Sequence, residues 1–452
     1  MDELKHVDNH MNDLIYDLQV LIKQPSVSAK NEGIEECAIL VQKLLKKSGI
    51  SSEILRLRKG VAPIVYGEVK SKQNPNKTIM FYNHYDVQPA EPFDLWEYSP
   101  FDGIRKGNKI FGRGATDDKG ELITRIKAVE ACLKTSGDVP CNIKFVIEGE
   151  EETGSANIES YLKKFKKKFS TDAVIWEFGY VDAKNRPIIG LGMKGLLFVE
   201  LSVKESIRDA HSSLAAIIKN PTWRLIEAIN TLRDSNGEIL IKDWYKEVTP
   251  FSKKDLELIS KEPFDANQFQ KEFGIKSFVG NKKSSLDAKK ALVGGATCNI
   301  AGFVSGYTGE GAKTVLPSEA LVKIDFRLVP KMDPKKQIMR LKKHLKLKGF
   351  SDITVKIYHG EAAARTDSSL PFVSQVKSAA DKSFGTSILN VSNAGTGPMF
   401  PFVDILKAPC ISIGSTYMFS RIHSPNEFAR IDLLKKTTKC ICLILQNFGS
   451  TK

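Results

Sequence analysis

Apolar and polar positions along the chain form short apolar runs separated by longer stretches with helical spacing. The apolar runs predict buried strands at 78–82, 143–147, 173–176 and 410–413. Residues 121–133 carry apolar side chains at the spacing of a helix, and residues 14–45 do the same with an interruption near Pro25. Strands that alternate with helices are typical of βαβ units, so this part of the chain predicts a largely parallel sheet.

The pattern changes near residue 196. From there the chain predicts strands at 196–203 and 320–328 and helices at 221–232 and 334–347, with a polar stretch at 252–290. This order indicates a smaller α+β domain inserted into the first one. We therefore expect an α/β protein with a discontinuous domain at 1–195 and 363–452 and an inserted domain at 196–362.

Length and composition agree with two folded domains. The chain has 452 residues, of which 42% are hydrophobic and 27% charged. The net charge of +14 raises the alternative of a nucleic-acid partner, with the lysine run at 163–168 as its strongest local support. Apolar residues interrupt that run as they do on an amphipathic helix, and no nucleic-acid motif accompanies it. We therefore interpret it as a solvated lysine face and expect no nucleic-acid partner.

Cysteine usage and the apolar runs bear on location. The seven cysteines are scattered without a Cys-x-x-Cys pair, so we expect buried thiols in a reducing compartment. The N-terminal residues lack a basic stretch followed by a long apolar run, which argues against a secretory signal. No apolar run reaches the roughly 18 residues of a membrane helix. The expected setting is the cytoplasm, without a membrane.

Metal-type ligands follow several of the predicted strands. The strand at 78–82 runs into His84-x-Asp86, where His84 is a candidate metal ligand and Asp86 a residue that orients the imidazole. A purely structural His-x-Asp pair is the alternative. Asp117 and Asp118 follow a glycine-containing loop, where either one could instead cap the next helix.

The strand at 143–147 leads into the acidic run Glu150-Glu151-Glu152. Three consecutive carboxylates after a buried strand repel one another, and a nearby dication removes that penalty and lets one carboxylate act as a base. The alternative is a solvated acidic turn that caps the helix after Ser155.

Glu177 ends the strand at 173–176, and the strand at 410–413 precedes a loop that reaches His423. Ligands in open α/β sheets gather beyond the carboxyl ends of the strands, so these groups are expected to converge. Two histidines and three carboxylates match a pair of zinc ions about 3.5 to 4 Å apart.

The motifs His84-x-Asp86, Asp117-x-Lys119-Gly120, Glu151-Glu152-x-Gly154-Ser155, Glu177 and His423 occur in the order found in one family. The chain resembles the di-zinc metallohydrolases that include carnosinase, glutamate carboxypeptidase, aminoacylase, acetylornithine deacetylase and succinyl-diaminopimelate desuccinylase. The resemblance covers nearly the whole chain and is weakest at 238–290. It implies a zinc-exopeptidase-like catalytic domain with an inserted lid domain through which two chains form a homodimer.

The resemblance also implies a role for each candidate ligand. Asp117 would bridge two metal ions, His84 and Glu177 would complete one site, and Glu152 and His423 would complete the other. Glu151 would be the general base that takes a proton from the bridging water, and Asp86 would support His84.

In the lid, the resemblance implies that His211 stabilises the oxyanion and Arg327 grips the substrate carboxylate. Thr314 and Thr396 match positions that contact substrate. Taken alone, His211 is equally an ordinary surface residue, Arg327 a partner of a structural acid, and the threonines turn residues.

The favoured function is a metal-dependent exopeptidase of dipeptidase or carboxypeptidase type, acting on a small peptide. An N-acyl-amino-acid deacylase is the alternative, and a non-catalytic peptide-binding homologue is a third. Thr314 resembles the dipeptidase branch, whereas Glu177 is typical of carboxypeptidases and deacylases. Zinc suits the ligands, and cobalt or manganese would also fit.

Overall fold

The computed structural model describes residues 2–450, and the chain forms two compact units. The first comprises Met1–Gly192, Arg365–Val391 and Pro398–Lys452, and the second comprises Met193–Ala364 and Ser392–Gly397. The segment Ser392–Gly397 thus differs from the sequence expectation, which assigned it to the domain at 363–452. Its hydrogen bonds to the second unit explain the difference. The main-chain oxygen of Asn393 accepts from the main-chain nitrogen of Lys194, and the hydroxyl of Thr396 accepts from the side chain of Arg327.

The first unit is built on a sheet whose central strands are parallel. Strands β6, β3, β7 and β19 pair in parallel, whereas β1, β2 and β6 pair antiparallel at one edge. The strand order is β1 (Ser51–Leu55), β2 (Ile64–Val69), β6 (Asn142–Glu148), β3 (Thr78–His84), β7 (Ala173–Trp176), β19 (Cys410–Ser412), β9 (Ile188–Gly190) and β18 (Ile388–Asn390).

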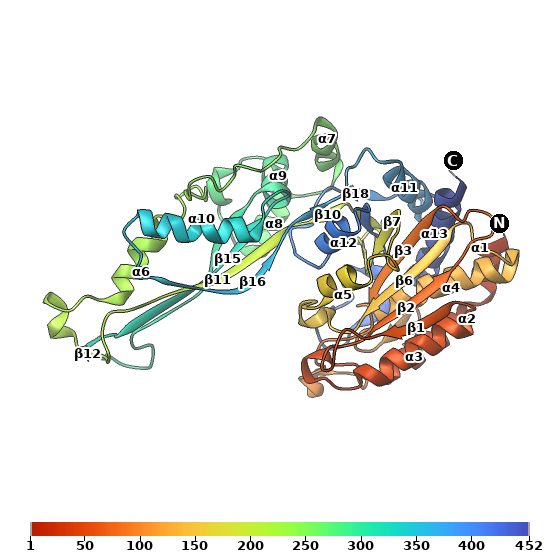
Figure 1. The fold of residues 1–452 in the computed structure, drawn as a ribbon, viewed down its shortest axis with the longest axis horizontal. Helices are drawn as coiled ribbons and strands as arrows, with labels where there is room; N and C mark the ends of the chain where they lie inside the picture. Colours follow the sequence, from red (N-terminus) through yellow and green to blue (C-terminus); the bar gives the residue numbers. More distant parts are fainter. Residues whose placement is uncertain (1, 451–452) are drawn as a thin grey trace. The chain divides into compact units, whose positions relative to one another are not determined.

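Helices cover both faces of this sheet (Figure 1), and consecutive residues of its central strands, which point to opposite faces, are accordingly buried. On β3, Ile79 and Phe81 join the larger core, whereas Tyr82 packs against Phe402 of the opposite face, with the two rings tilted and 4.6 Å between their centroids. The larger core is formed with α1 (Asp2–Asn9), α2 (Met11–Lys23), α3 (Ile34–Lys47), α4 (Lys119–Ser136), α11 (Pro371–Phe384) and α13 (Ile431–Ser450). The other face carries α5 (Ile158–Lys164) and α12 (Phe400–Ile405).

The second unit has an antiparallel sheet of four strands with two helices on one face. The buried side chains of β11 alternate with exposed or half-buried ones, so one face packs against the helices. The strand order is β13 (Thr297–Ser305), β15 (Glu319–Leu328), β11 (Gly195–Lys204) and β16 (Thr354–Glu361), and the helices are α6 (Pro221–Asn230) and α10 (Pro334–Leu347). The predicted α/β fold with an α+β insertion is confirmed.

The stretch predicted only as polar forms three helices. They are α7 (Lys253–Lys261), α8 (Ala266–Phe273) and α9 (Ser285–Gly294). The signals are local, because Ser252 and Asp255 form a reciprocal capping box and Ser284 caps α9.

The seven cysteines of the chain are all free and buried. Within residues 2–450, no helix is both long and apolar enough to cross a bilayer.

Candidate metal centre

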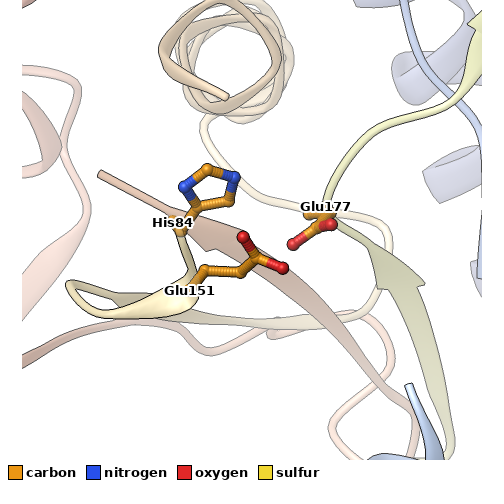
Figure 2. Close-up of side chains that lie close together, drawn as sticks. All are labelled: His84, Glu151 and Glu177. Atoms are coloured by element: carbon orange, nitrogen blue, oxygen red, sulfur yellow. The ribbon is translucent and has the colours of Figure 1, made fainter. Parts of the chain in front are cut away.

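Three neighbouring strands end at the same edge of the first unit's sheet and bring candidate ligands there. His84 is the last residue of β3, Glu177 follows β7 directly, and Glu151 begins the short turn after β6. Because β6, β3 and β7 are adjacent and parallel, their carboxyl ends meet. Figure 2 shows the three side chains pointing toward one another, and one ligand atom of each lies within 4.8 Å of the others.

Asp117 lies between two histidines. Its Oδ1 is 3.1 Å from Nε2 of His84, and its Oδ2 is 3.3 Å from Nε2 of His423. The same His423 nitrogen lies 3.0 Å from Oε2 of Glu152. Each oxygen of Asp117 therefore faces a different imidazole, which is the arrangement a carboxylate needs in order to bridge two cations.

Asp86 connects His84 with the acidic turn. Nδ1 of His84 lies 3.0 Å from the main-chain oxygen of Asp86 and 3.5 Å from its carboxylate. That carboxylate accepts hydrogen bonds from the main-chain nitrogens of Glu151 and Glu152, at 3.1 and 3.0 Å. Asp86 thereby directs Nε2 of His84 toward Asp117 and fixes the turn that carries both glutamates.

The three glutamates of the acidic run make two kinds of contact. Glu150 accepts hydrogen bonds from the main-chain and side-chain nitrogens of Asn157, the residue that precedes α5. Glu151 and Glu152 instead face His84 and His423, and the Glu152 side chain is only 4% exposed. The capping alternative thus holds for Glu150 and not for the other two.

The electrostatics of this cluster favour a bound cation. Burial raises the pKa of the Glu151, Glu152 and Glu177 carboxyls, since the charged forms lose solvation. Burial also disfavours ionisation of Asp117, but hydrogen bonds from His423 and His84 outweigh it and lower its pKa. The hydrogen bonds to Asp117 and Glu152 raise the pKa of His423 to about 10. Without metal, these carboxylates therefore depend on protons to offset their mutual repulsion. A bound dication would offset the same repulsion.

The side chains present fit divalent metal ions. Oε2 of Glu177 is buried and has no hydrogen-bond partner among residues 2–450, although the Glu177 carboxylate lies beside His84. Imidazole nitrogens and carboxylate oxygens are the ligands that zinc takes in catalytic sites. The cluster can hold metal, with Asp117 placed between its two halves.

Glu427 was not predicted as a functional residue, yet it holds the loop that presents Asp117. One of its carboxylate oxygens accepts from the main-chain nitrogens of Thr116 and Asp117, at 3.1 and 3.2 Å. The other pairs with Arg113 at 2.8 Å and accepts from the nitrogen of Gly114. The pattern of residues gives no signal for this contact, because its partners are about three hundred positions apart.

Asp118 precedes α4 but forms no capping hydrogen bond with it. Its Oδ2 accepts instead from the side chain of Asn83, at 2.6 Å, and from the main-chain nitrogen of His84, at 3.1 Å. The capping alternative for Asp118 is therefore wrong. The carboxylate instead satisfies two buried donors at the end of β3.

The second unit brings its candidate residues together in two pairs. His211, on β12 (Ala210–His211), has Nε2 3.2 Å from the hydroxyl of Thr314. Arg327 donates to the hydroxyl of Thr396 at 2.8 Å. Arg327 forms no ion pair with a carboxylate among residues 2–450, so its charge remains available to an anion.

Lys194 is a second cation near Arg327 that was not predicted. Lys194 directly precedes β11, on which Leu196 pairs with Arg327, and the two cations are close enough to interact electrostatically. Lys194 is 3% exposed, and its ammonium donates to the main-chain oxygen of Gly295 at 2.5 Å. Burial and the neighbouring Arg327 guanidinium lower the pKa of Lys194 to about 8.

The chain is similar to known metallopeptidases over most of its length. The structure of a Sulfolobus solfataricus protein described as the M20 family metallo-carboxypeptidase Sso-CP2 superposes with a TM-score of 0.88 and 37% identity, over 97% of this chain and 99% of that one. Human Beta-Ala-His dipeptidase is 31% identical over 289 residues, which are 63% of this chain and 56% of the relative. The Cys-Gly metallodipeptidase DUG1 of Candida albicans is 31% identical over 283 residues, which are 61% of this chain and 57% of the relative.

The similarity to these two curated relatives spans somewhat more than half of their own length. The family model described as Peptidase family M20/M25/M40 matches residues 80–447, a span that contains every candidate ligand from His84 to His423. Because this match covers most of the chain, the protein belongs to peptidase family M20/M25/M40, in agreement with the resemblance that its motifs indicate.

Proposed function

We propose that the protein is a metal-dependent exopeptidase, of dipeptidase or carboxypeptidase type, that cleaves the peptide bond of a small substrate with a free carboxylate. The observation that carries the proposal is the position of Asp117, whose two oxygens each face a different histidine. We assign His84 and Glu177 to one metal ion, Glu152 and His423 to the other, and Asp117 to both.

Two bound dications would lower the pKa of a coordinated water to about 7 and polarise the scissile carbonyl. Glu151 is the group that we assign to proton transfer. Its carboxyl lies beside His84 and Glu177, the ligands that we assign to one metal ion, and a positioned glutamate is a common general base. It takes a proton from the attacking water and gives it to the leaving amine.

The second unit supplies substrate-binding groups in this proposal. His211 donates to the developing oxyanion from an imidazole that Thr314 helps to orient. Arg327 binds the substrate carboxylate, with its guanidinium held by Thr396. Lys194 adds a second positive charge near Arg327.

An N-acyl-amino-acid deacylase would use the same centre on a different acyl group. Glu177 favours a carboxypeptidase or deacylase, whereas Thr314 favours a dipeptidase. The names of the relatives support the two peptidase types, since they are described as a metallo-carboxypeptidase and as dipeptidases. We therefore place peptide hydrolysis first.

A substrate panel tests the proposal. Purified protein loaded with zinc is assayed on dipeptides, on the same dipeptides amidated at the C-terminus, and on acetylornithine and succinyl-diaminopimelate. We expect hydrolysis of free dipeptides and a large rise in KM for the amidated controls. Hydrolysis of only the acylated amino acids would establish the deacylase alternative, and no hydrolysis of any compound would refute both.

We further propose zinc as the metal, a homodimer formed through the second unit, and the cytoplasm as the location. The buried, free state of all cysteines supports a reducing compartment. Strands β13 and β16 are edges of the second sheet, and β13 exposes Ile300 and Val304. Such edges are commonly covered by a partner.

A further inference from the structure

Arg125 is a fully buried cation on α4 that has no place in the mechanism above. Its guanidinium donates to the main-chain oxygens of Trp176, at 3.0 Å, and Ile413, at 3.3 Å, and lies 3.5 Å from that of Tyr82. These oxygens belong to the ends of β7, β19 and β3, which are consecutive in the sheet. One side chain therefore contacts three neighbouring strands.

These contacts lie where the pairing of the strands stops. The last paired residues of β3 and β7 are Phe81 and Ile175, and those of β19 and β7 are Ser412 and Trp176. The guanidinium contacts main-chain oxygens at or just past these last pairs, in Tyr82, Trp176 and Ile413. A planar guanidinium with five donors can bond to several such oxygens at once and keep the ends of the three strands at a fixed distance.

The ligands of one proposed metal ion follow directly on these strands. Trp176 precedes Glu177, and Tyr82 is two residues before His84. A shift of either strand end would change the distance between the Glu177 carboxylate and the His84 imidazole. Within residues 2–450, the hydrogen bonds of Arg125 go to these strand ends and not to Glu152 or His423, the ligands that we assign to the other ion.

Charge supports the same arrangement. Arg125 lies among the buried carboxyls of Asp118, Glu121 and Glu177, which interact with it electrostatically. Glu121, one helical turn earlier on α4, accepts hydrogen bonds from Ser415 and Thr416, just beyond β19. Arg125 and Glu121 thus hold the same edge of the sheet, and their opposite charges reduce the cost of burying each other.

We propose that Arg125 is a positioning residue that sets the separation of His84 and Glu177 and so determines the affinity of one of the two metal sites. The proposal rests on the metal assignment above. It predicts an unequal effect: removing Arg125 weakens the His84–Glu177 site and leaves the Glu152–His423 site close to its original affinity.

The test compares Arg125→Met, which keeps the length of the side chain but no donor, with Arg125→Lys, which keeps the charge but not the planar fork. Lys127→Met is the matched control, because Lys127 is a buried cation on the same helix that pairs with Asp17 and Glu130 instead of with the strand ends. Zinc affinity and stoichiometry are measured by calorimetry and elemental analysis, and circular dichroism verifies folding.

We expect Lys127→Met to bind two ions with the same affinities as the wild type, even if it melts at a lower temperature. Arg125→Met should lose about 10- to 100-fold in affinity at one site only, and Arg125→Lys should lie between the two. Excess zinc should then restore much of the activity of Arg125→Met. If Arg125→Met does not fold, Arg125→Lys decides, with a loss at one site as the expected result.

Wild-type affinity at both sites in the folded Arg125 variants would overturn the proposal, as would an equal loss at both sites. These outcomes are distinct from failure of the proposed function. In that case the wild type itself would bind no stoichiometric metal.

Discussion

The two adjacent glutamates after β6 offer a sharp test of the proposed chemistry. Glu151→Gln replaces the proposed base with a nearly isosteric amide. Its main-chain nitrogen would still donate to Asp86, and its side chain makes no hydrogen bond with the described part of the chain that the substitution would break. Glu152→Gln changes a side chain that contacts the His423 imidazole at 3.0 Å and accepts from Gln88 at 3.0 Å. The two substitutions are chemically identical but alter different contacts.

The expected magnitudes follow from these positions. An amide cannot take up a proton, and general acid–base catalysis contributes about 10²–10⁴-fold. Glu151→Gln should therefore lower kcat by about 10²–10⁴-fold, which corresponds to a barrier higher by about 3 to 5 kcal/mol. It should leave two metal ions bound and KM little changed. Glu152→Gln should lower both kcat and metal affinity, because it weakens a proposed ligand.

The assay combines steady-state kinetics on a dipeptide with elemental analysis of each variant after gel filtration. Glu151 also lies within ligand distance of His84 and Glu177, so the metal content of Glu151→Gln is the decisive value. Loss of an ion from Glu151→Gln with both retained in Glu152→Gln would show that the roles are reversed. Unchanged turnover in both variants would refute the catalytic interpretation of the acidic run.

Three further predictions concern the whole protein. The chain should bind two divalent ions and lose activity with a strong chelator, whereas trace metal in elemental analysis together with chelator-resistant activity would contradict the metal assignment. Light scattering should give a dimer, and a fully active monomer of 50.2 kDa would rule out a required dimer. The pKa of Lys194 is about 8 in the folded chain, against 10.5 for the free side chain. Between pH 8 and 10.5 the unfolded chain therefore binds more protons than the folded chain, so the free energy of unfolding rises with pH. The free energy of unfolding of the wild type, relative to Lys194→Met, should therefore rise by up to about 1.4 kcal/mol per pH unit from pH 8 to 10.5 in denaturant titrations. A difference that does not change with pH would show that Lys194 titrates normally.

Much of the local structure was predictable because it depends on neighbouring residues. The apolar run at 173–176 became β7 with the same bounds, and the helix predicted at 334–347 became α10. The ligand candidates His84 and Glu177 could be found because each follows such a run, and parallel strands bring their carboxyl ends to one edge. The helices at 253–294 also had local capping signals, in Ser252 and Ser284, that a description of the stretch as polar overlooks.

The contacts that fix the geometry of the centre were decided only by the tertiary structure. The run Glu150-Glu151-Glu152 is chemically uniform along the chain, and only the position of Asn157 separates the capping glutamate from the two that face the histidines. Glu427 and Arg125 find their partners on elements remote in sequence. Periodicity reports which side of a strand or helix is buried, but not which strand lies beside it. A buried carboxylate or guanidinium takes whichever donors or acceptors the packing leaves unpaired, and that set exists only once the sheet has formed.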